Sequence, residues 1–225
     1  IVNSGCEKLC RVHLTRVEIR ADCNDSQLEQ IVDTIAAHPE ITDAVLRTDT
    51  DLPDSIEEIE RVVHALRAGT GVRFFRMRSR VFHDAPLFYD ASVVERYAAL
   101  QNLSVADPVR FELETLVLNA DQLQDDHRRV VELFHQHGVT VYLNSCLLHN
   151  VNDSPAAMRA LSSKCRRFGF EFHHLYVAGA QTQRHWNTRR PVDIDTIVGI
   201  ATELRRNGSG RDLPEGRGGH PAPDP

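Results

Sequence analysis

The chain has 225 residues, of which 41% are apolar and 26% are charged, and this composition predicts one globular domain rather than a disordered or fibrous chain. The formal net charge of -6, without a basic tract, argues against nucleic acid and membrane surfaces as partners and leaves small ligands open. No apolar run is long enough for a membrane span and no signal-peptide pattern opens the chain, so we expect a cytoplasmic protein.

Short β-branched or aromatic runs alternate with amphipathic stretches, which is the pattern of parallel strands joined by crossover helices. Capping boxes mark two helix starts, at Ser26 with Glu29 and at Ser55 with Glu58. The expected elements are strands at 1–3, 44–46, 72–77, 111–118, 139–143 and 170–177, and helices at 26–37, 55–69, 92–101, 125–137, 155–169 and 194–206. Six strand-helix units predict an α/β fold, a partial (β/α)6 barrel of the TIM type that is short of the eight units of a closed barrel.

We expect this barrel to occupy residues 1–207. The remaining segment, 208–225, is rich in Gly and Pro and has no periodicity, so the sequence predicts a loop or a disordered tail there. Because the chain does not begin with Met, we also expect it to be a piece of a longer protein.

Three soft ligands stand close together near the start of the chain, Cys6, Cys10 and His13, at the spacing Cys-x-x-x-Cys-x-x-His. Thiolate and imidazole groups are metal ligands, so this stretch predicts a metal site. The residues alone leave open a zinc site completed by Cys23 or His174, or a loop without metal. An odd number of cysteines without a regular framework fits a reducing compartment.

The cysteine loop after a first strand, in a barrel of six units, resembles the radical S-adenosylmethionine enzymes. Residues 147–153, Leu-Leu-His-Asn-Val-Asn-Asp, are similar to the Leu-Leu-x-Gly-Val-Asn-Asp stretch of the lysine 2,3-aminomutase-like branch of that superfamily. Residues 76–80 are similar to its Arg-Ile-x-Ser-Arg strand, and residues 214–219 to its loop rich in Pro and Gly. The resemblance covers nearly the whole chain.

The resemblance implies a [4Fe-4S] cluster that binds S-adenosylmethionine to make a 5′-deoxyadenosyl radical, and pyridoxal phosphate that carries the migrating amino group. It places the cluster ligands at Cys6, Cys10 and His13, and cofactor-binding positions at Asp49, Asp51, Arg76, Arg78, Arg80, Asn144, Ser145 and His220. No single residue is implied as the catalytic group.

The chain departs from the family's pattern at the cluster and at the turn after the second strand. His13 stands where the family has its third thiolate, and imidazole ligates iron in Rieske centres but changes charge and potential. The family's Gly-Gly-Asp or Gly-Gly-Glu turn falls on residues 47–51. Asp49 or Asp51 offers a carboxylate there, but neither glycine is present, so side chains crowd a backbone that has to approach the methionine amine.

The chain also departs from the pattern at the amino-acid end of the site. His220 stands in the place of the pyridoxal lysine, and a histidine cannot form the Schiff base. The only lysines are Lys8 and Lys164, neither at that place, so we do not expect bound pyridoxal phosphate. The family's acidic residue after the sixth strand falls near Gly179, where no carboxylate is present.

Two groups of side chains on predicted strands are further candidates. Arg76, Arg78 and Arg80 share one face at strand period 2, so they are expected to line a phosphate or carboxylate pocket inside the barrel; the alternative is a solvated edge strand. His173 and His174 are expected to point to opposite faces, and only the inward one is a functional candidate.

Two hypotheses of function follow from the resemblance and its departures. In the first, the chain is a degenerate member that lacks aminomutase turnover and keeps its barrel to bind a small amino acid or nucleoside, or to assemble with a protein partner or a second copy. In the second, it is a divergent radical isomerase whose cluster is held by two cysteines and one histidine, without pyridoxal phosphate. Losses at four separate ligand positions favour the first, although fold alone does not decide function.

Overall fold

The computed structural model describes residues 15–48, 56–177, 181–207 and 215–217. The strands are β1 (Arg16–Arg20), β2 (Asp43–Arg47), β3 (Phe74–Arg78), β4 (Arg110–Leu116), β5 (Thr140–Cys146), β6 (Glu171–Tyr176) and β7 (Glu215–Arg217). The helices are α1 (Asp25–Ala36), α2 (Ile56–Gly69), α3 (Val81–Asp84), α4 (Ala91–Ala99), α5 (Asp125–Gln136), α6 (Pro155–Phe168), α7 (Gln181–Trp186) and α8 (Ile194–Asn207), with short 3-10 turns η2 (Pro86–Phe88) and η3 (Ala120–Gln122). Strands and helices alternate as expected, so the α/β class is confirmed.

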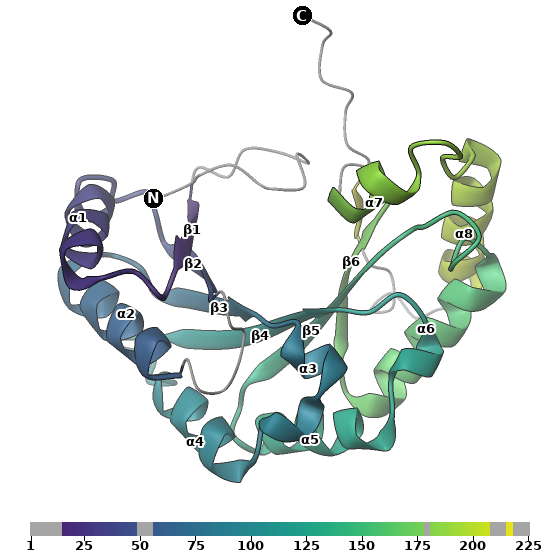
Figure 1. The fold of residues 1–225 in the computed structure, drawn as a ribbon. Coiled ribbons are helices and arrows are strands. Elements are labelled where there is room, and N and C mark those ends of the chain that lie inside the picture. Colours follow the sequence, from purple (N-terminus) through teal and green to yellow (C-terminus); the bar gives the residue numbers. More distant parts are fainter. Residues whose placement is uncertain (1–14, 49–55, 178–180, 208–214, 218–225) are drawn as a thin grey trace, which may run out of the picture.

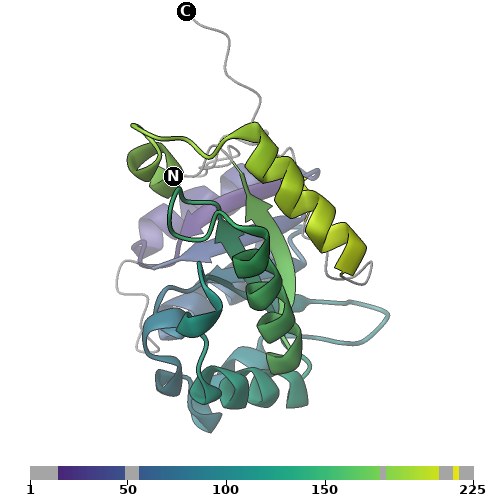
Figure 2. The ribbon, with the colours of Figure 1, turned by 90° about the vertical axis from the view of Figure 1, so that its right-hand side faces the viewer.

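All seven strands form one parallel sheet in which each strand pairs with the next strand along the chain, from β1 to β7. Figure 1 shows that the sheet is curved and that α1, α2, α4, α5, α6 and α8 lie along its outer side. In the view of Figure 2, α6 and α8 lie next to one another beside β6. The partial barrel itself stays a prediction.

The hydrophobic core lies between the sheet and the outer helices. Alternate strand residues, such as Phe75 and Met77 of β3, are buried there against apolar stripes of the helices. Phe82, Tyr97 and Phe134 add an aromatic group at the centre of this layer. Within the described part of the chain, none of the helices combines the length and the apolar character of a membrane span.

Local signals account for several helix ends. Ser154 caps α6 by accepting a hydrogen bond from the Ala157 N–H, Pro155 occupies the first turn, and Gly169 ends the helix with a left-handed φ of 85°. The start at Pro155 and the end at Gly169 agree with the predicted range. The predicted capping box at Ser26 is wrong, because the structure places it two residues earlier, at Asn24 with Gln27.

Two strands were not predicted. Residues 1–3, the expected first strand, lie outside the described residues, and β1 instead follows the cysteine loop in sequence. It alternates polar and apolar residues because only one of its faces packs on the core. β7 lies in the segment expected to lack regular structure, and its three residues are held as a strand by pairing with β6.

Candidate ligand-binding face

The face of the sheet opposite the outer helices is lined by polar side chains, and we call it the inner face. Because strand side chains alternate, the neighbours of each core residue point there; Arg76 and Arg78, for example, flank the buried Met77. The inner-face side chains used below are Glu18 of β1, Arg47 of β2, Arg76 and Arg78 of β3, Glu112 and Glu114 of β4, Tyr142 and Asn144 of β5, and His173 and His174 of β6.

Three arginines and three glutamates of the inner face form one chain of ion pairs. Arg76 Nη2 lies 2.6 Å from Glu112 Oε2, and Arg76 Nη1 lies 3.3 Å from Glu114 Oε2. Arg78 Nε donates a hydrogen bond of 3.0 Å to Glu114 Oε1, and Arg78 Nη1 lies 3.4 Å from Glu18 Oε2. The six residues, which we call the arginine-glutamate network, run in the order Arg47, Glu18, Arg78, Glu114, Arg76 and Glu112.

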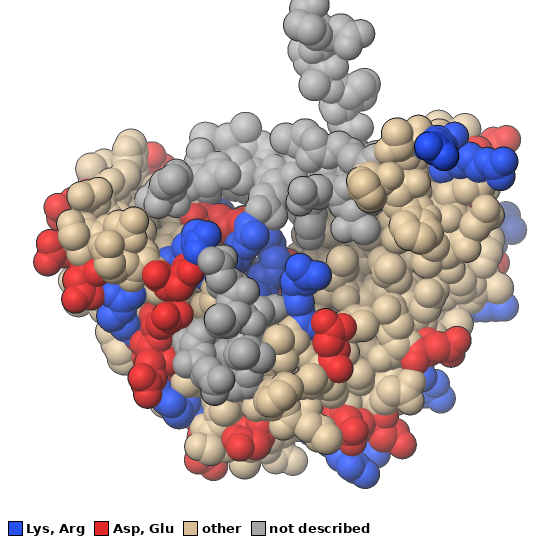
Figure 3. Space-filling model, viewed as in Figure 1, with Lys and Arg blue, Asp and Glu red and all other residues tan. Residues whose placement is uncertain are grey.

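The centre of the network, around Glu114, is withdrawn from water, and the network holds Arg76 and Arg78 charged. Glu114 is 4% exposed and bridges two guanidinium groups. Burial by itself would lower the pKa of Arg76, but attraction first to Glu114 and then to Glu112 outweighs it, so this pKa lies above its ordinary value. Burial would also lower the pKa of Arg78, but attraction first to Glu114 and then to Glu18 outweighs it, so this pKa too lies above its ordinary value. Figure 3 shows positive and negative side chains side by side in the hollow of this view.

The predicted arginine pocket stays a prediction. Arg76 and Arg78 do face inward, but their counter-ions are glutamates of β4 and β1 rather than an open place for an anion. The prediction that Arg80 shares their face is wrong, because β3 ends at Arg78. Arg80 adopts helical backbone angles as the N-cap of α3, and its side chain is exposed.

The two histidines of β6 lie together, so the prediction that they point to opposite faces is wrong. His174 pairs with Asn144, and Phe172 pairs with Leu143, which leaves His173 as an extra residue in a β-bulge. A bulge interrupts the alternation of side chains. The ring centroids of His173 and His174 are 3.8 Å apart, and that of His173 lies 4.8 Å from Tyr142.

Tyr142 joins this aromatic row to the arginine-glutamate network. The guanidinium carbon of Arg76 lies 5.0 Å from the centroid of the Tyr142 ring, within the range of a cation-π contact. Burial and then the charge of Glu112 raise the pKa of Tyr142, so its hydroxyl stays protonated near neutral pH. Polar and aromatic side chains therefore run without a break from β1 to β6.

Asn144 and Ser145, predicted as neighbours in a cofactor site, lie on opposite faces of the sheet. Asn144 faces inward at strand period 2 from Tyr142 and is 1% exposed. Neither its amide oxygen nor its amide nitrogen has a hydrogen-bond partner in the described part of the chain. Ser145 faces the core, where it pairs with Leu175 in the sheet register.

The segment after β5, which carries the Leu-Leu-His-Asn-Val-Asn-Asp motif, is held by one buried amide. Asn152 Oδ1 accepts a hydrogen bond of 2.8 Å from the Leu148 N–H. Its Nδ2 donates bonds of 3.0 Å to the carbonyls of Leu118 and Cys146. Asn152 thereby connects this loop to the ends of β4 and β5.

The short helix α7 packs on the same segment. Gln183 Nε2 donates to the Leu147 carbonyl at 3.1 Å, and Trp186 Nε1 donates to the His149 carbonyl at 3.1 Å. Asn187 accepts from the His149 N–H at 3.0 Å. These bonds fix the residues that follow β6 against the residues that follow β5.

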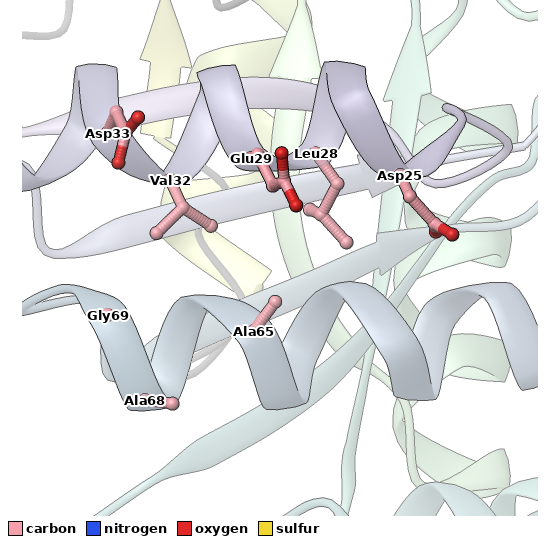
Figure 4. Close-up of a pocket in the computed structure, with 8 residues that line it drawn as sticks. All are labelled: Asp25, Leu28, Glu29, Val32, Asp33, Ala65, Ala68 and Gly69. Atoms are coloured by element: carbon pink, nitrogen blue, oxygen red, sulfur yellow. The ribbon is translucent and has the colours of Figure 1, made fainter.

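A groove of about 640 Å³ lies elsewhere, between α1 and α2 on the outer side of the sheet. Figure 4 shows the carboxylates of α1 on one side of it and the small residues of α2 on the other. Its lining residues are Asp25, Leu28, Glu29, Val32, Asp33, Ala65, Ala68 and Gly69. The groove shares no residue with the inner face.

Several predicted site residues lie outside the described residues: Cys6, Cys10, His13, Asp49, Asp51 and His220. Cys23 and His174, the alternative zinc ligands, are described. Within residues 15–48, 56–177, 181–207 and 215–217, no three His, Cys, Asp or Glu side chains are grouped so that they would hold a metal ion.

Comparison with known proteins gives a distant match. No family model matches the chain. It is 23% identical to the L-lysine 2,3-aminomutase of Escherichia coli (strain K12) over 181 residues, which are 79% of this chain and 50% of that protein. It is 24% identical to the L-lysine 2,3-aminomutase of Clostridium subterminale over 205 residues, 89% of this chain and 47% of that protein. The chain is similar to lysine 2,3-aminomutases.

This similarity supports the superfamily suggested by the motifs, that of the radical S-adenosylmethionine enzymes. The chain spans about half the length of the curated relatives it matches. Any activity of a whole lysine 2,3-aminomutase is therefore a matter of proposal for this chain.

The glutamates of the inner face are the functional candidates that the sequence reasoning missed. Glu112 and Glu114 alternate with core residues in Arg110–Leu116, and Glu18 does the same in β1. Charged residues at the inward positions of neighbouring parallel strands are the signal that would have found them. The resemblance to the lysine 2,3-aminomutase-like branch implied a cofactor-binding role for the arginines of β3 but not for these glutamates.

Proposed function

We propose that the chain is a partial (β/α)6 barrel of the radical S-adenosylmethionine type that has lost lysine 2,3-aminomutase turnover and keeps its inner face to bind a small ligand. One observation carries the proposal: Arg76 and Arg78, which the resemblance assigns to cofactor binding, are neutralised by Glu112, Glu114 and Glu18. A phosphate or carboxylate would have to displace protein carboxylates, of which Glu114 is buried, to reach them.

The residues present do not fit pyridoxal phosphate. His220 holds the place of the Schiff-base lysine, and Lys164, the one lysine in the described residues, lies on α6 with its Nζ 5.6 Å from the Phe168 ring centroid. Arg76 and Arg78 are engaged with carboxylates. Incubation with pyridoxal phosphate, borohydride reduction and peptide mass mapping should give no stoichiometric lysine adduct; such an adduct on Lys8 or Lys164 would contradict this part of the proposal.

A second candidate function rests on the Cys6, Cys10 and His13 spacing, which supplies three iron-binding donors in eight residues. In this alternative the chain is a divergent radical isomerase whose cluster cleaves S-adenosylmethionine without pyridoxal phosphate. The donor set fits an iron-sulfur cluster chemically, since imidazole replaces thiolate in Rieske centres.

Anaerobic reconstitution with iron and sulfide, followed by dithionite and S-adenosylmethionine, separates the two candidates. We expect no sustained release of methionine and 5′-deoxyadenosine, and no conversion of lysine. Strong cleavage by the unmodified protein would refute the proposal and favour the divergent enzyme. Uptake of zinc but never of iron would identify a structural metal site instead.

The His13→Cys variant is the matched control for the cluster. If the loop binds a cluster, this variant should hold a more stable [4Fe-4S] centre of lower potential, because a thiolate adds negative charge where imidazole adds none. Cleavage should nevertheless stay weak, since Thr48 and Asp49 occupy the place of the glycine turn. Absorption and electron paramagnetic resonance spectra report the cluster independently of turnover.

A further inference from the structure

The amide of Asn144 is a buried polar group of the inner face without an assigned role. It is 1% exposed, and its donor and acceptor atoms both lack partners in the described part of the chain. Folded proteins satisfy nearly all buried polar atoms, because an unpaired one loses its bonds to water without replacement. A ligand that offers an acceptor and a donor side by side would satisfy both atoms at once.

The neighbours of Asn144 favour a flat ligand. In the sheet, Asn144 lies between Leu116 of β4 and His174 of β6. Tyr142 is the preceding residue of β5 that faces inward. The centroids of the His174 and Tyr176 rings are 5.5 Å apart. Aromatic rings stack on planar groups. The amide therefore lies on the same face of the sheet as a row of aromatic rings, which suit a conjugated ligand.

The charges of the inner face disfavour an anion. Each arginine of the arginine-glutamate network already has a carboxylate partner, and among its six residues three positive charges meet three negative ones. These carboxylates are tethered to the same sheet, so a free anion competes with groups that are already in place. A neutral molecule faces no such competition.

We propose that the inner face binds an uncharged planar ligand with a carboxamide-type group, held through Asn144, and rejects the corresponding carboxylate. This inference rests on the proposed ligand-binding role of the inner face and adds the chemical class of the ligand. It assigns Asn144 as the recognition residue and the arginine-glutamate network as the source of selectivity against anions.

Nicotinamide and nicotinate form a matched pair of probes, since they share a planar ring and differ only in carboxamide against carboxylate. Binding to the full chain at pH 7 is measured by titration, with chemical-shift changes of labelled protein as the readout. We expect saturable binding of nicotinamide, at least about tenfold tighter than that of nicotinate. Equal affinities, or preference for nicotinate, would overturn the inference.

The Asn144→Leu variant tests the recognition residue with two readouts. It should lose nicotinamide binding, while its unfolding midpoint should equal or exceed that of the unmodified protein, because an apolar side chain replaces an unpaired polar one. A variant that is destabilised would show that Asn144 has a structural partner, and the inference would be wrong. A crystal structure with a water bonded to both amide atoms, and no nicotinamide bound, would also refute it.

Glu112→Gln and Glu114→Gln test the selectivity. Each removes one negative charge beside Arg76, so nicotinate affinity should rise several-fold relative to nicotinamide affinity. Glu112 is the more accessible of the two and serves if Glu114→Gln does not fold. Glu132→Gln, which opens an exposed ion pair with Arg128 on α5, is the control and should change neither affinity.

These binding tests are independent of the cleavage assay of the proposed function. Cleavage of S-adenosylmethionine together with selective nicotinamide binding would refute the loss of turnover but keep the ligand class. Absence of cleavage together with absence of nicotinamide binding would refute the ligand class alone.

Discussion

Replacing Asn152 should destabilise the fold more than its position in a loop would indicate. Its side chain is 1% exposed and makes three hydrogen bonds, to the Leu148 N–H and to the carbonyls of Leu118 and Cys146. Asn152→Ala removes all three hydrogen bonds, and the three backbone groups lose their bonds to this side chain. Asn152→Asp is nearly isosteric, but it sets a carboxylate oxygen against two carbonyl oxygens.

The magnitude follows from the bonds. Each is worth about 1 kcal/mol net, so Asn152→Ala should lower the free energy of unfolding by about 3 kcal/mol. Asn152→Asp should cost at least as much at pH 7, since the new carboxylate is both buried and repelled. Burial would raise the pKa of the carboxyl that this variant introduces. As pH rises, the unfolded protein therefore releases this proton at a lower pH than the folded protein does. The deficit of this variant should therefore shrink between pH 7 and pH 5.

Urea unfolding followed by circular dichroism at both pH values measures these differences. Gln30→Ala, which removes an exposed amide from α1, is the control and should stay within about 0.5 kcal/mol of the unmodified protein. If Asn152→Asp matched the control at pH 7, the hydrogen bonds of Asn152 would not be contributing to stability, and the reasoning would fail.

Stability should decline below about pH 6.5, because burial lowers the pKa of His127, whose Nδ1 accepts the Gln124 N–H at 3.0 Å. As pH falls, the unfolded chain binds a proton at this histidine before the folded protein does. In His127→Gln, the urea midpoint should therefore depend less on pH between pH 7 and pH 5. Gly169→Ala should cost about 1–2 kcal/mol in urea unfolding, because its φ is 85° and a Cβ would lie 3.0 Å from His135 Cε1; an unchanged midpoint would contradict this. Ser154→Ala should cost about 1 kcal/mol by removing the α6 cap, and Ser154→Asp should restore it in the same assay.

Sequence patterns predicted most of the fold because most elements bury one strongly apolar face. The expected helices at 125–137 and 155–169 match α5 and α6 to within a residue at each end. Strand β1 was missed, since its charged inner face dilutes the apolar signal to two residues, Val17 and Ile19. Strand β7 was missed because three residues carry too little local preference, and pairing with β6 decides their conformation.

The candidate site was predicted less completely than the fold. The positions of Arg76 and Arg78 followed from strand period 2, but the identity of their partners depends on which strands are neighbours and in which register. The bulge at His173 changes the face of a single residue, and no local residue preference predicts this bulge. The orphan amide of Asn144 is likewise a property of packing, visible only once β4, β5 and β6 lie side by side.

The order of the sheet also bears on how the molecule folds. Each of the strands β1 to β6 pairs with the next strand of the chain, so each strand pairing in the described sheet closes a segment that holds one or two helices. Loop-closure entropy then stays similar from one step to the next. On the ribosome, early strands have their partners as soon as the following unit emerges, and the sheet is able to grow in the direction of synthesis.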